Sequence, residues 1–247
     1  MMSHAAAHYF SAIRTKLTQL EADSAMHDRA AALMAQAVIA GKNLFVFGAS
    51  HAGIISEEMC YRAGGLAVVN PLFSAALMLN VRPLPLTSAL ENVEGLGRAL
   101  LEASPVAAGD VVLIHSVSGR NPVVLDVALT ARARGAQVIA ITSLDTAQHV
   151  TPRHSSGKLL CDVADVVINN HCDYGDAAVA LPQVAQKAAP LSTVLGATIC
   201  NLLVLRISEQ LLAEGLTPPL LASANIDGNQ KINQDIFNRY RSQIHYL

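Results

Sequence analysis

The sequence predicts an α/β fold in which layers of helix pack against a parallel sheet. Two short apolar runs, at residues 43–47 and 111–114, are each followed by small residues and then by a helical pattern. A third apolar run, at residues 137–142, ends in hydroxyl residues. Continuous apolar runs of this length are typical of strands that are buried on both faces. Because these strands alternate with helices, we expect them to run parallel to one another.

The chain of 247 residues is expected to form a single domain over residues 1–247. Residues 1–40 show two apolar stripes at helical spacing with a break at residues 22–24, which predicts an N-terminal helical hairpin. Such a hairpin can pack on the sheet or on a second subunit. Residues 41–215 form the α/β core, and residues 216–247 form a C-terminal tail.

The composition excludes several classes of protein. The formal net charge is −2 and no basic recognition element is visible, so no nucleic-acid partner is expected. The N-terminus has no basic region followed by an apolar core, which argues against a signal peptide. The apolar stretch at residues 191–205 contains polar residues and predicts a buried helix, so no membrane partner is expected. Four cysteines without zinc spacing indicate reduced thiols in a cytoplasmic protein.

The central strand of the predicted sheet leads into a loop of small hydroxyl residues. Ser116, Ser118 and Gly119 follow the apolar run, and Asn121 and Pro122 open a helix as N-cap and first helical residue. Unpaired backbone N–H groups and the positive end of the helix dipole favour an anion such as phosphate at this point. The alternative is an ordinary strand–turn–helix connection in which the serines form the turn.

Two further predicted strands end in small or polar residues. Gly48, Ser50 and His51 follow the first strand, and Ser143 follows the strand at residues 137–142. The carboxyl ends of parallel strands meet at one edge of a sheet, where such folds bind ligands. This convergence favours a phosphate site over a plain turn. The first loop lacks the third glycine of a dinucleotide motif, so no nucleotide is expected there.

A polar loop at residues 171–176 follows the last predicted strand. It holds a histidine, a cysteine and two carboxylates, but their spacing matches no standard metal site. We therefore interpret this segment as a polar loop at the edge of the sheet, and we expect no metal and no other cofactor.

The residues at this point resemble the sugar isomerase (SIS) domain family, and the resemblance covers most of the chain. The segment S-V-S-G-R-N at residues 116–121 is similar to the family's S-x-S-G-x-[ST] phosphate loop. A closer likeness is to a branch of stand-alone SIS proteins, which share several short motifs with this chain. These motifs are Y-R-A-G-G (61–65), S-G-R-N-P (118–122), D-V-A-D-V-V-I (162–168), Y-G-D-A-A-V (174–179) and S-A-N-x-D-G (223–228).

This resemblance implies a three-layer α-β-α sandwich with a five-stranded parallel sheet, a homodimer, and recognition of a phosphorylated sugar. By position, Ser116, Ser118 and Asn121 would hold the phosphate, with Gly119 allowing close approach of the backbone and Ser50 as a further contact. Relatives usually have glycine at the position of Ser50 and serine or threonine at that of Asn121. Further candidate substrate contacts are Gly48, Ser143, Ser192, Thr193, Asn225 and Asp227.

Aldose–ketose isomerisation requires a base that moves a proton between C1 and C2. The candidate catalytic residues are Glu57 and Glu58 on the helix after the first loop, His51 before it, and His171 after the last strand. The alternative for Glu58 is an i,i+4 ion pair with Arg62.

The sequence therefore predicts a protein that binds a phosphorylated sugar or amino sugar and isomerises it. One alternative is a non-catalytic sensor of phosphosugars, although the N-terminal residues contain no basic helix-turn-helix. The other is a lyase or etherase that acts on an N-acetylated sugar phosphate. Ser192 and Thr193, at the start of a buried helix, resemble a pair of hydroxyl residues found in that class.

Overall fold

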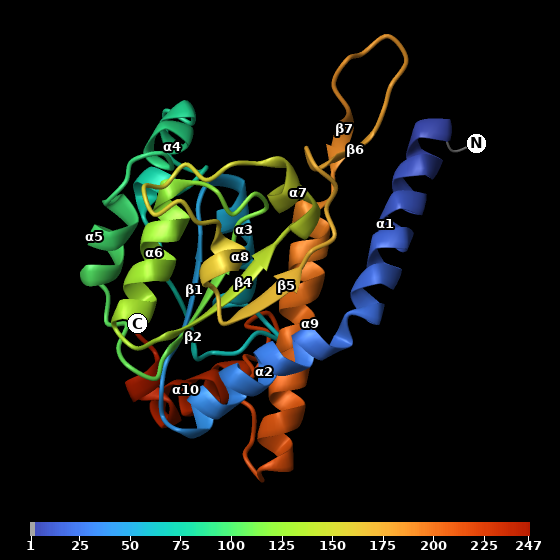
Figure 1. The fold of residues 1–247 in the computed structure, drawn as a ribbon. Coiled ribbons are helices and arrows are strands. Elements are labelled where there is room, and N and C mark those ends of the chain that lie inside the picture. Colours follow the sequence, from blue (N-terminus) through green and yellow to red (C-terminus); the bar gives the residue numbers. More distant parts are fainter. Residues whose placement is uncertain (1–2) are drawn as a thin grey trace.

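The computed structural model describes residues 3–247 and places a five-stranded sheet at the centre of the molecule, in the order β2-β1-β3-β4-β5 (Figure 1). All neighbouring strands are parallel, which confirms the predicted α/β fold. The strands are β1 (Leu44–Gly48), β2 (Val69–Pro71), β3 (Val111–His115), β4 (Gln137–Thr142) and β5 (Val166–Asn169).

The strand register brings the loops of the predicted site to one edge of the sheet. Gly48 at the end of β1 pairs with His115 at the end of β3, and His115 pairs with Ile141 of β4. The segments after these strands therefore start at nearly the same level. This is the edge at which parallel α/β folds bind ligands.

Helices cover both faces of the sheet, so the fold has the three layers that the resemblance implied. Alternate residues of β3 enter different layers, because successive side chains of a strand point to opposite faces: Leu113 packs in one layer and Ile114 in the other. One face is covered by α2 (Ser24–Ile39), α3 (Ile54–Met59) and α9 (Ser192–Ala213), and the other by α5 (Leu96–Glu102), α6 (Pro122–Ala133) and α8 (Leu160–Val163).

The N-terminal residues form two helices with the expected break, but they do not form a hairpin. Helix α1 (His4–Ala22) begins where the Ser3 side chain accepts a hydrogen bond from the Ala6 N–H group, at 3.2 Å. The chain bends at Asp23, and α2 leads away from α1 across the sheet instead of folding back along it (Figure 1). The reason is that α2 packs against α9, whereas α1 contacts α9 and the β6–β7 hairpin described below.

Helix α9 is the longest helix of the core and explains the apolar stretch in the sequence. It is long and apolar enough to meet the criteria for a membrane span, but half of its most apolar window is buried within the fold. Its buried side chains, which include Leu195, Leu203 and Leu211, pack in the same layer as those of α2. The prediction of a buried helix is therefore consistent with its packing.

The tail contains a helix that the sequence analysis did not predict. Residues 223–228 form the expected turn, and α10 (Asn229–Arg239) follows it. The buried Asn70 side chain then fixes the end of the chain, since its Nδ2 donates to the Gln243 carbonyl at 2.9 Å and its Oδ1 accepts from the His245 N–H at 2.7 Å. The remaining elements are η1 (Ser50–Gly53), η2 (Ala75–Leu77), α4 (Pro85–Leu90), α7 (Leu144–His149), β6 (Ala177–Val179), β7 (Ala188–Pro190) and η3 (Arg241–Gln243).

Candidate functional site

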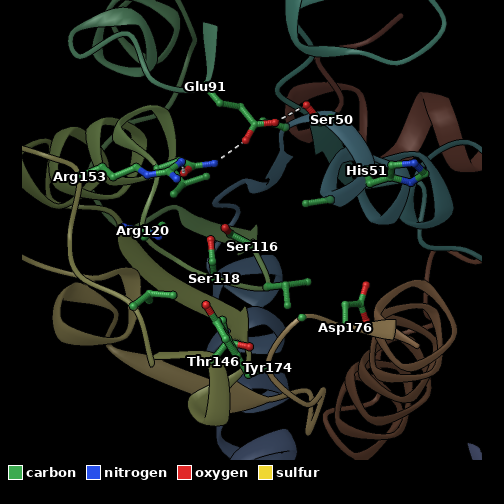
Figure 2. Close-up of a pocket in the computed structure, with 17 residues that line it drawn as sticks. Ser50, His51, Glu91, Ser116, Ser118, Arg120, Thr146, Arg153, Tyr174 and Asp176 are labelled. Atoms are coloured by element: carbon green, nitrogen blue, oxygen red, sulfur yellow. Dashed lines mark hydrogen bonds between the residues drawn. The ribbon is translucent and has the colours of Figure 1, made fainter. Parts of the chain in front are cut away.

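A cavity of about 420 Å³ opens at the C-terminal edge of the sheet (Figure 2). Its walls come from the loops after β1 and β3, the segment before α5, and the segments at residues 146–153 and 174–176. Ser116 and Ser118 lie at its centre, between Glu91 on one side and Asp176 on the other. The loops that the sequence analysis expected to converge therefore meet at one cavity.

The serine loop after β3 is held in shape by its own glycine. The Gly119 N–H donates to Ser116 Oγ at 3.2 Å, and the Gly119 carbonyl accepts from the Leu160 N–H at 2.8 Å. Gly119 has a φ of 58°, and a Cβ atom built on it would lie 3.1 Å from Leu160 Cβ and 3.2 Å from Thr142 Oγ1. This backbone conformation favours glycine, and a side chain at this position would press on both neighbours. The Ser118 side chain makes no hydrogen bond within residues 3–247 and is available to a ligand.

The first turn of α6 is arranged differently from the expected anion site. Asn121 occupies the N-cap position, but its side chain makes no capping hydrogen bond. The Val123 N–H donates to the Glu91 carbonyl at 3.2 Å, and the Val124 N–H donates to the Asn121 carbonyl at 3.2 Å. The N–H groups of Val123 and Val124 are therefore paired, whereas those of Ser118, Arg120 and Asn121 in the loop before the helix make no hydrogen bond within the described residues.

Glu91, which the sequence analysis did not single out, connects two predicted phosphate contacts. Its carboxylate accepts hydrogen bonds from the Ser50 hydroxyl and from the Asn121 amide (Figure 2). Ser50 has a φ of 51°, a left-handed conformation that directs its side chain to Glu91 from the start of η1. The three residues together form one wall of the cavity.

Two arginines line the cavity, and neither forms an ion pair with a carboxylate within residues 3–247. Arg153 Nη1 donates to Asn121 Oδ1 at 3.0 Å, and Arg120 Nη2 donates to Thr151 Oγ1 at 3.3 Å. The buried Nε of Arg120 has no hydrogen-bond partner in this part of the chain. These positive charges are therefore not neutralised by the protein's own acids at contact distance.

Asp176 forms the opposite wall and fixes the start of α9. Its Oδ1 accepts from the N–H groups of Leu191 and Ser192 at 3.1 and 2.8 Å, and its Oδ2 accepts from Ser192 Oγ at 2.6 Å. The Ser192 hydroxyl, a predicted substrate contact, is thus occupied by Asp176. A carboxylate at this position also interacts favourably with the positive end of the helix dipole.

His51 and Gly48 are the other predicted residues at or near the cavity. His51 is exposed at the cavity rim. Gly48 lies beneath the loop that carries Ser50, and a Cβ atom on Gly48 would lie 2.4 Å from the Ala52 carbonyl oxygen. Gly48 therefore allows the loop to pass close to the end of β1.

The predicted catalytic glutamates lie outside the cavity. Glu58 forms the ion pair with Arg62 that was the alternative interpretation, and it also accepts from Asn201 Nδ2 at 3.0 Å. Glu57 is exposed on the same short helix, α3. Both glutamates line a separate surface hollow together with Arg62, and neither lines the cavity.

His171 and Ser143 also have structural partners. His171 Nε2 lies 2.7 Å from Asp23 Oδ2 at the bend between α1 and α2. Ser143 caps α7 by accepting from the Thr146 N–H at 3.0 Å, and its hydroxyl donates to the Cys172 carbonyl at 2.5 Å. The cavity lining does not include Thr193, Asn225 or Asp227, and the latter two are exposed in the tail.

The side chains of the loop at residues 171–176 point to different partners. Asp173 pairs with Lys16, and burial raises the pKa of the Cys172 thiol well above its ordinary range. A protonated thiol is a poor metal ligand, because the thiolate is the form that binds metals. Within residues 3–247, no three His, Cys, Asp or Glu side chains gather as metal ligands do.

His115, directly before the serine loop, is fully buried. Its Nδ1 lies 3.1 Å from the Ala52 carbonyl, and its Nε2 has no hydrogen-bond partner within the described residues. Burial lowers the pKa of His115 from its usual value of 6.5, because desolvation disfavours the imidazolium. The neutral imidazole is thus the favoured form of His115. It connects the end of β3 to the Ala52 carbonyl in the loop after β1.

This burial predicts that acid destabilises the protein. Below pH 6.5 the unfolded chain binds a proton at His115 more readily than the folded chain does, so stability falls with pH in this range. We expect His115→Asn to reduce this loss by up to about 1.4 kcal/mol per pH unit. The measurement is urea unfolding at pH 7, 6 and 5 for both proteins. Equal pH slopes in the two proteins would contradict the assignment.

The fold and the serine loop beside the cavity together define a SIS-domain protein, and the family model described as SIS domain matches residues 8–143. The chain belongs to this family and, within it, to the UPF0309 family. A UPF0309 protein of Shouchella clausii is 48% identical over 246 residues and covers 100% of both chains. A UPF0309 protein of Oceanobacillus iheyensis is 49% identical over 218 residues, which are 88% of this chain and 89% of the relative.

Solved structures show the same fold. The phosphoheptose isomerase GmhA from Neisseria gonorrhoeae matches with a TM-score of 0.52 and 20% identity over 84% of this chain and 96% of its own. A phosphoheptose isomerase from Francisella tularensis matches with a TM-score of 0.53 and 16% identity over 81% of this chain and 95% of its own. The resemblance drawn from the sequence is therefore confirmed at the level of family and fold.

Proposed function

We propose that this protein binds a phosphorylated sugar or amino sugar in the cavity, with the phosphate at the loop of Ser116 and Ser118. The main support is that both serines and two arginines without carboxylate partners line one cavity. Hydroxyl and guanidinium groups are strong donors to phosphate oxygens. The cavity volume of about 420 Å³ lies within the range of roughly 300–1,000 Å³ that small-molecule sites occupy.

We further propose that the bound sugar undergoes aldose–ketose isomerisation. Four lining side chains can accept or donate a proton, namely those of His51, Glu91, Tyr174 and Asp176. Asp176 already accepts three hydrogen bonds, which leaves His51, Glu91 and Tyr174 as the candidate acid–base groups of this chain. Incubation of a bound phosphosugar in D2O, followed by NMR, tests the reaction. Deuterium at C2 supports isomerisation, and its absence favours a sensor that binds without turnover.

A homodimer is the assembly that we propose for this protein. Helix α1 buries only Leu20, and Figure 1 shows α1 and the β6–β7 hairpin standing away from the sheet. Large apolar side chains are exposed on α1 and on α9, with Phe10 at 51% and Leu205 at 61%. A second copy would cover such surfaces. Sedimentation equilibrium tests this proposal, which a stable monomer at micromolar concentration would contradict.

Ser118→Ala is expected to weaken binding of the phosphosugar. The loss of one hydrogen bond to a charged phosphate corresponds to about 1.5–3 kcal/mol, or roughly 10- to 100-fold in affinity. The ligand is first identified by thermal shift against hexose, pentose, heptose and N-acetylhexosamine phosphates, with the parent sugars as controls, since a ligand that binds the folded state raises its melting temperature. Its affinity for each protein is then measured by calorimetry.

Ser88→Ala is the matched control, because Ser88 is exposed on α4 and does not line the cavity. The control should bind with the affinity of the unmodified protein. If Ser118→Ala also binds with unchanged affinity, the phosphate does not lie at this loop. If no phosphosugar stabilises the unmodified protein, the proposed function itself is wrong.

A further inference from the structure

The Glu91 carboxylate lies where two of the proposed phosphate donors converge. Ser50 and Asn121 come from the loops after β1 and β3, yet both donate to this one carboxylate, as the dashed lines in Figure 2 show. An ionised carboxylate and a phosphate are both acceptors of hydrogen bonds, so they compete for the same donors. The donors on this wall of the cavity are therefore occupied by a negative group of the protein itself.

The backbone of Glu91 is fixed, whereas its side chain reaches into the cavity. The Glu91 N–H donates to the Thr87 carbonyl at 2.9 Å, and the Glu91 carbonyl accepts from the Val123 N–H at 3.2 Å. These bonds anchor the residue to α4 and α6. The carboxylate itself is not held by a lysine or arginine in an ion pair within residues 3–247. The side-chain hydrogen bonds of the carboxylate are those from Ser50 and Asn121, and rotation about the side-chain bonds of Glu91 would break both without moving its backbone.

We propose that Glu91 is an internal competitor for the phosphate of the ligand, and that the ligand binds by displacing its carboxylate from Ser50 and Asn121. This inference rests on the proposed phosphosugar site. Two negative groups within a few ångströms repel each other, so the phosphate cannot simply bind alongside the carboxylate in its present position. Ser116, Ser118 and the two arginines supply the attraction that drives the exchange.

The displacement lowers the affinity only of ligands that use these donors. When only a minor fraction of the protein is in the binding-competent state, its apparent affinity for the ligand falls in proportion to that fraction. Removing the competitor should therefore strengthen the binding of phosphorylated ligands, while a parent sugar without phosphate should gain nothing. A phosphorylated ligand must therefore gain enough binding free energy from the rest of the site to offset the hydrogen bonds that Glu91 loses.

Glu91→Gln and Glu91→Ala test this inference against the unmodified protein. Glutamine keeps the shape of the side chain without its charge, and alanine removes both hydrogen-bond acceptors. We expect the affinity for inorganic phosphate and for the phosphosugar found in the thermal-shift screen to rise about tenfold or more, which corresponds to about 1.4 kcal/mol. Calorimetry gives both affinities, and circular dichroism establishes that each variant is folded.

Glu102→Gln is the matched control, because Glu102 is exposed on α5 and does not line the cavity. It should leave both affinities unchanged. Unchanged or weaker binding in folded Glu91→Gln would overturn the inference and would make Glu91 a direct contact or a brace of the site. If neither the unmodified protein nor any variant binds a phosphorylated probe, the proposed function fails and this inference fails with it. Stronger binding in Glu102→Gln would also overturn the inference, since a general charge effect would then explain the gain.

Discussion

Gly48→Ala is expected to destabilise the protein by about 3 kcal/mol, because an added methyl group in a fully packed site forces the backbone to move. The added Cβ would lie 2.4 Å from the Ala52 carbonyl oxygen, 2.7 Å from the Ala52 carbonyl carbon and 2.9 Å from the Gly53 nitrogen. All three are backbone atoms, so no side chain can rotate away. The loop that would have to move carries Ser50, and we therefore expect phosphosugar binding to weaken as well.

Urea unfolding measures this effect, with Gly64→Ala as the control. Gly64 has a φ of 79°, but a Cβ atom on it would meet no other atom within 4 Å. Its substitution should lower stability by only about 1–2 kcal/mol, the cost of a left-handed backbone for a residue other than glycine. A smaller loss at Gly48 than at Gly64 would show that the loop yields easily and that the close approach does not stabilise the fold.

The sheet could be predicted from the sequence because its strands are buried on both faces. Val112 and Ile114 pack on one layer of helices, and Val111 and Leu113 pack on the other. Both sets must therefore be apolar, which produces an unbroken run that stands out in the sequence. The N-terminal part of the tail was predicted correctly, but α10 was not. It is short and mostly polar, and its narrow apolar stripe of Ile232, Ile236 and Phe237 contains no fully buried residue.

The candidate site was only partly predictable, because some of its residues directly follow a recognisable strand and others do not. Ser116 and Ser118 directly follow a recognisable strand, so their position at the sheet edge could be inferred. Glu91 and Arg153 reach the same cavity from segments without regular periodicity, and no local pattern indicates which way they point. Helix α5 begins at Leu96, directly after Gly95 with its left-handed φ of 93°. Glu91 therefore lies in the segment before α5 and not within that helix.

Glu58 shows the opposite case, in which a suitable residue type lies near the right loop but serves another purpose. The helix α3 begins directly after η1, and its register turns Glu58 towards Arg62 and Asn201 of α9. The sequence allowed Glu58 to be either a catalytic base or the ion-pair partner of Arg62. Only the packing of α3 against α9 distinguishes these two interpretations.

Asp176→Ala is expected to destabilise the protein by about 3 kcal/mol, because charged hydrogen-bond partners at helix starts contribute roughly 1–2 kcal/mol each. The substitution removes the acceptor of two N–H groups and one hydroxyl at the start of α9, a helix of 22 residues that crosses the core. Asp176 also has a φ of 62°, a conformation that aspartate tolerates better than alanine does. Thermal and urea unfolding measure the loss.

Asp173→Ala is a closely matched control, since it removes the same group from the same loop. The Asp173 side chain is 57% exposed and pairs with Lys16 at 2.5 Å. Exposed ion pairs contribute at most about 1 kcal/mol, so Asp173→Ala should change stability little. A similar loss in both variants would mean that Asp176 does not anchor α9. A large loss at Asp176 alone would establish that this carboxylate is a structural clamp.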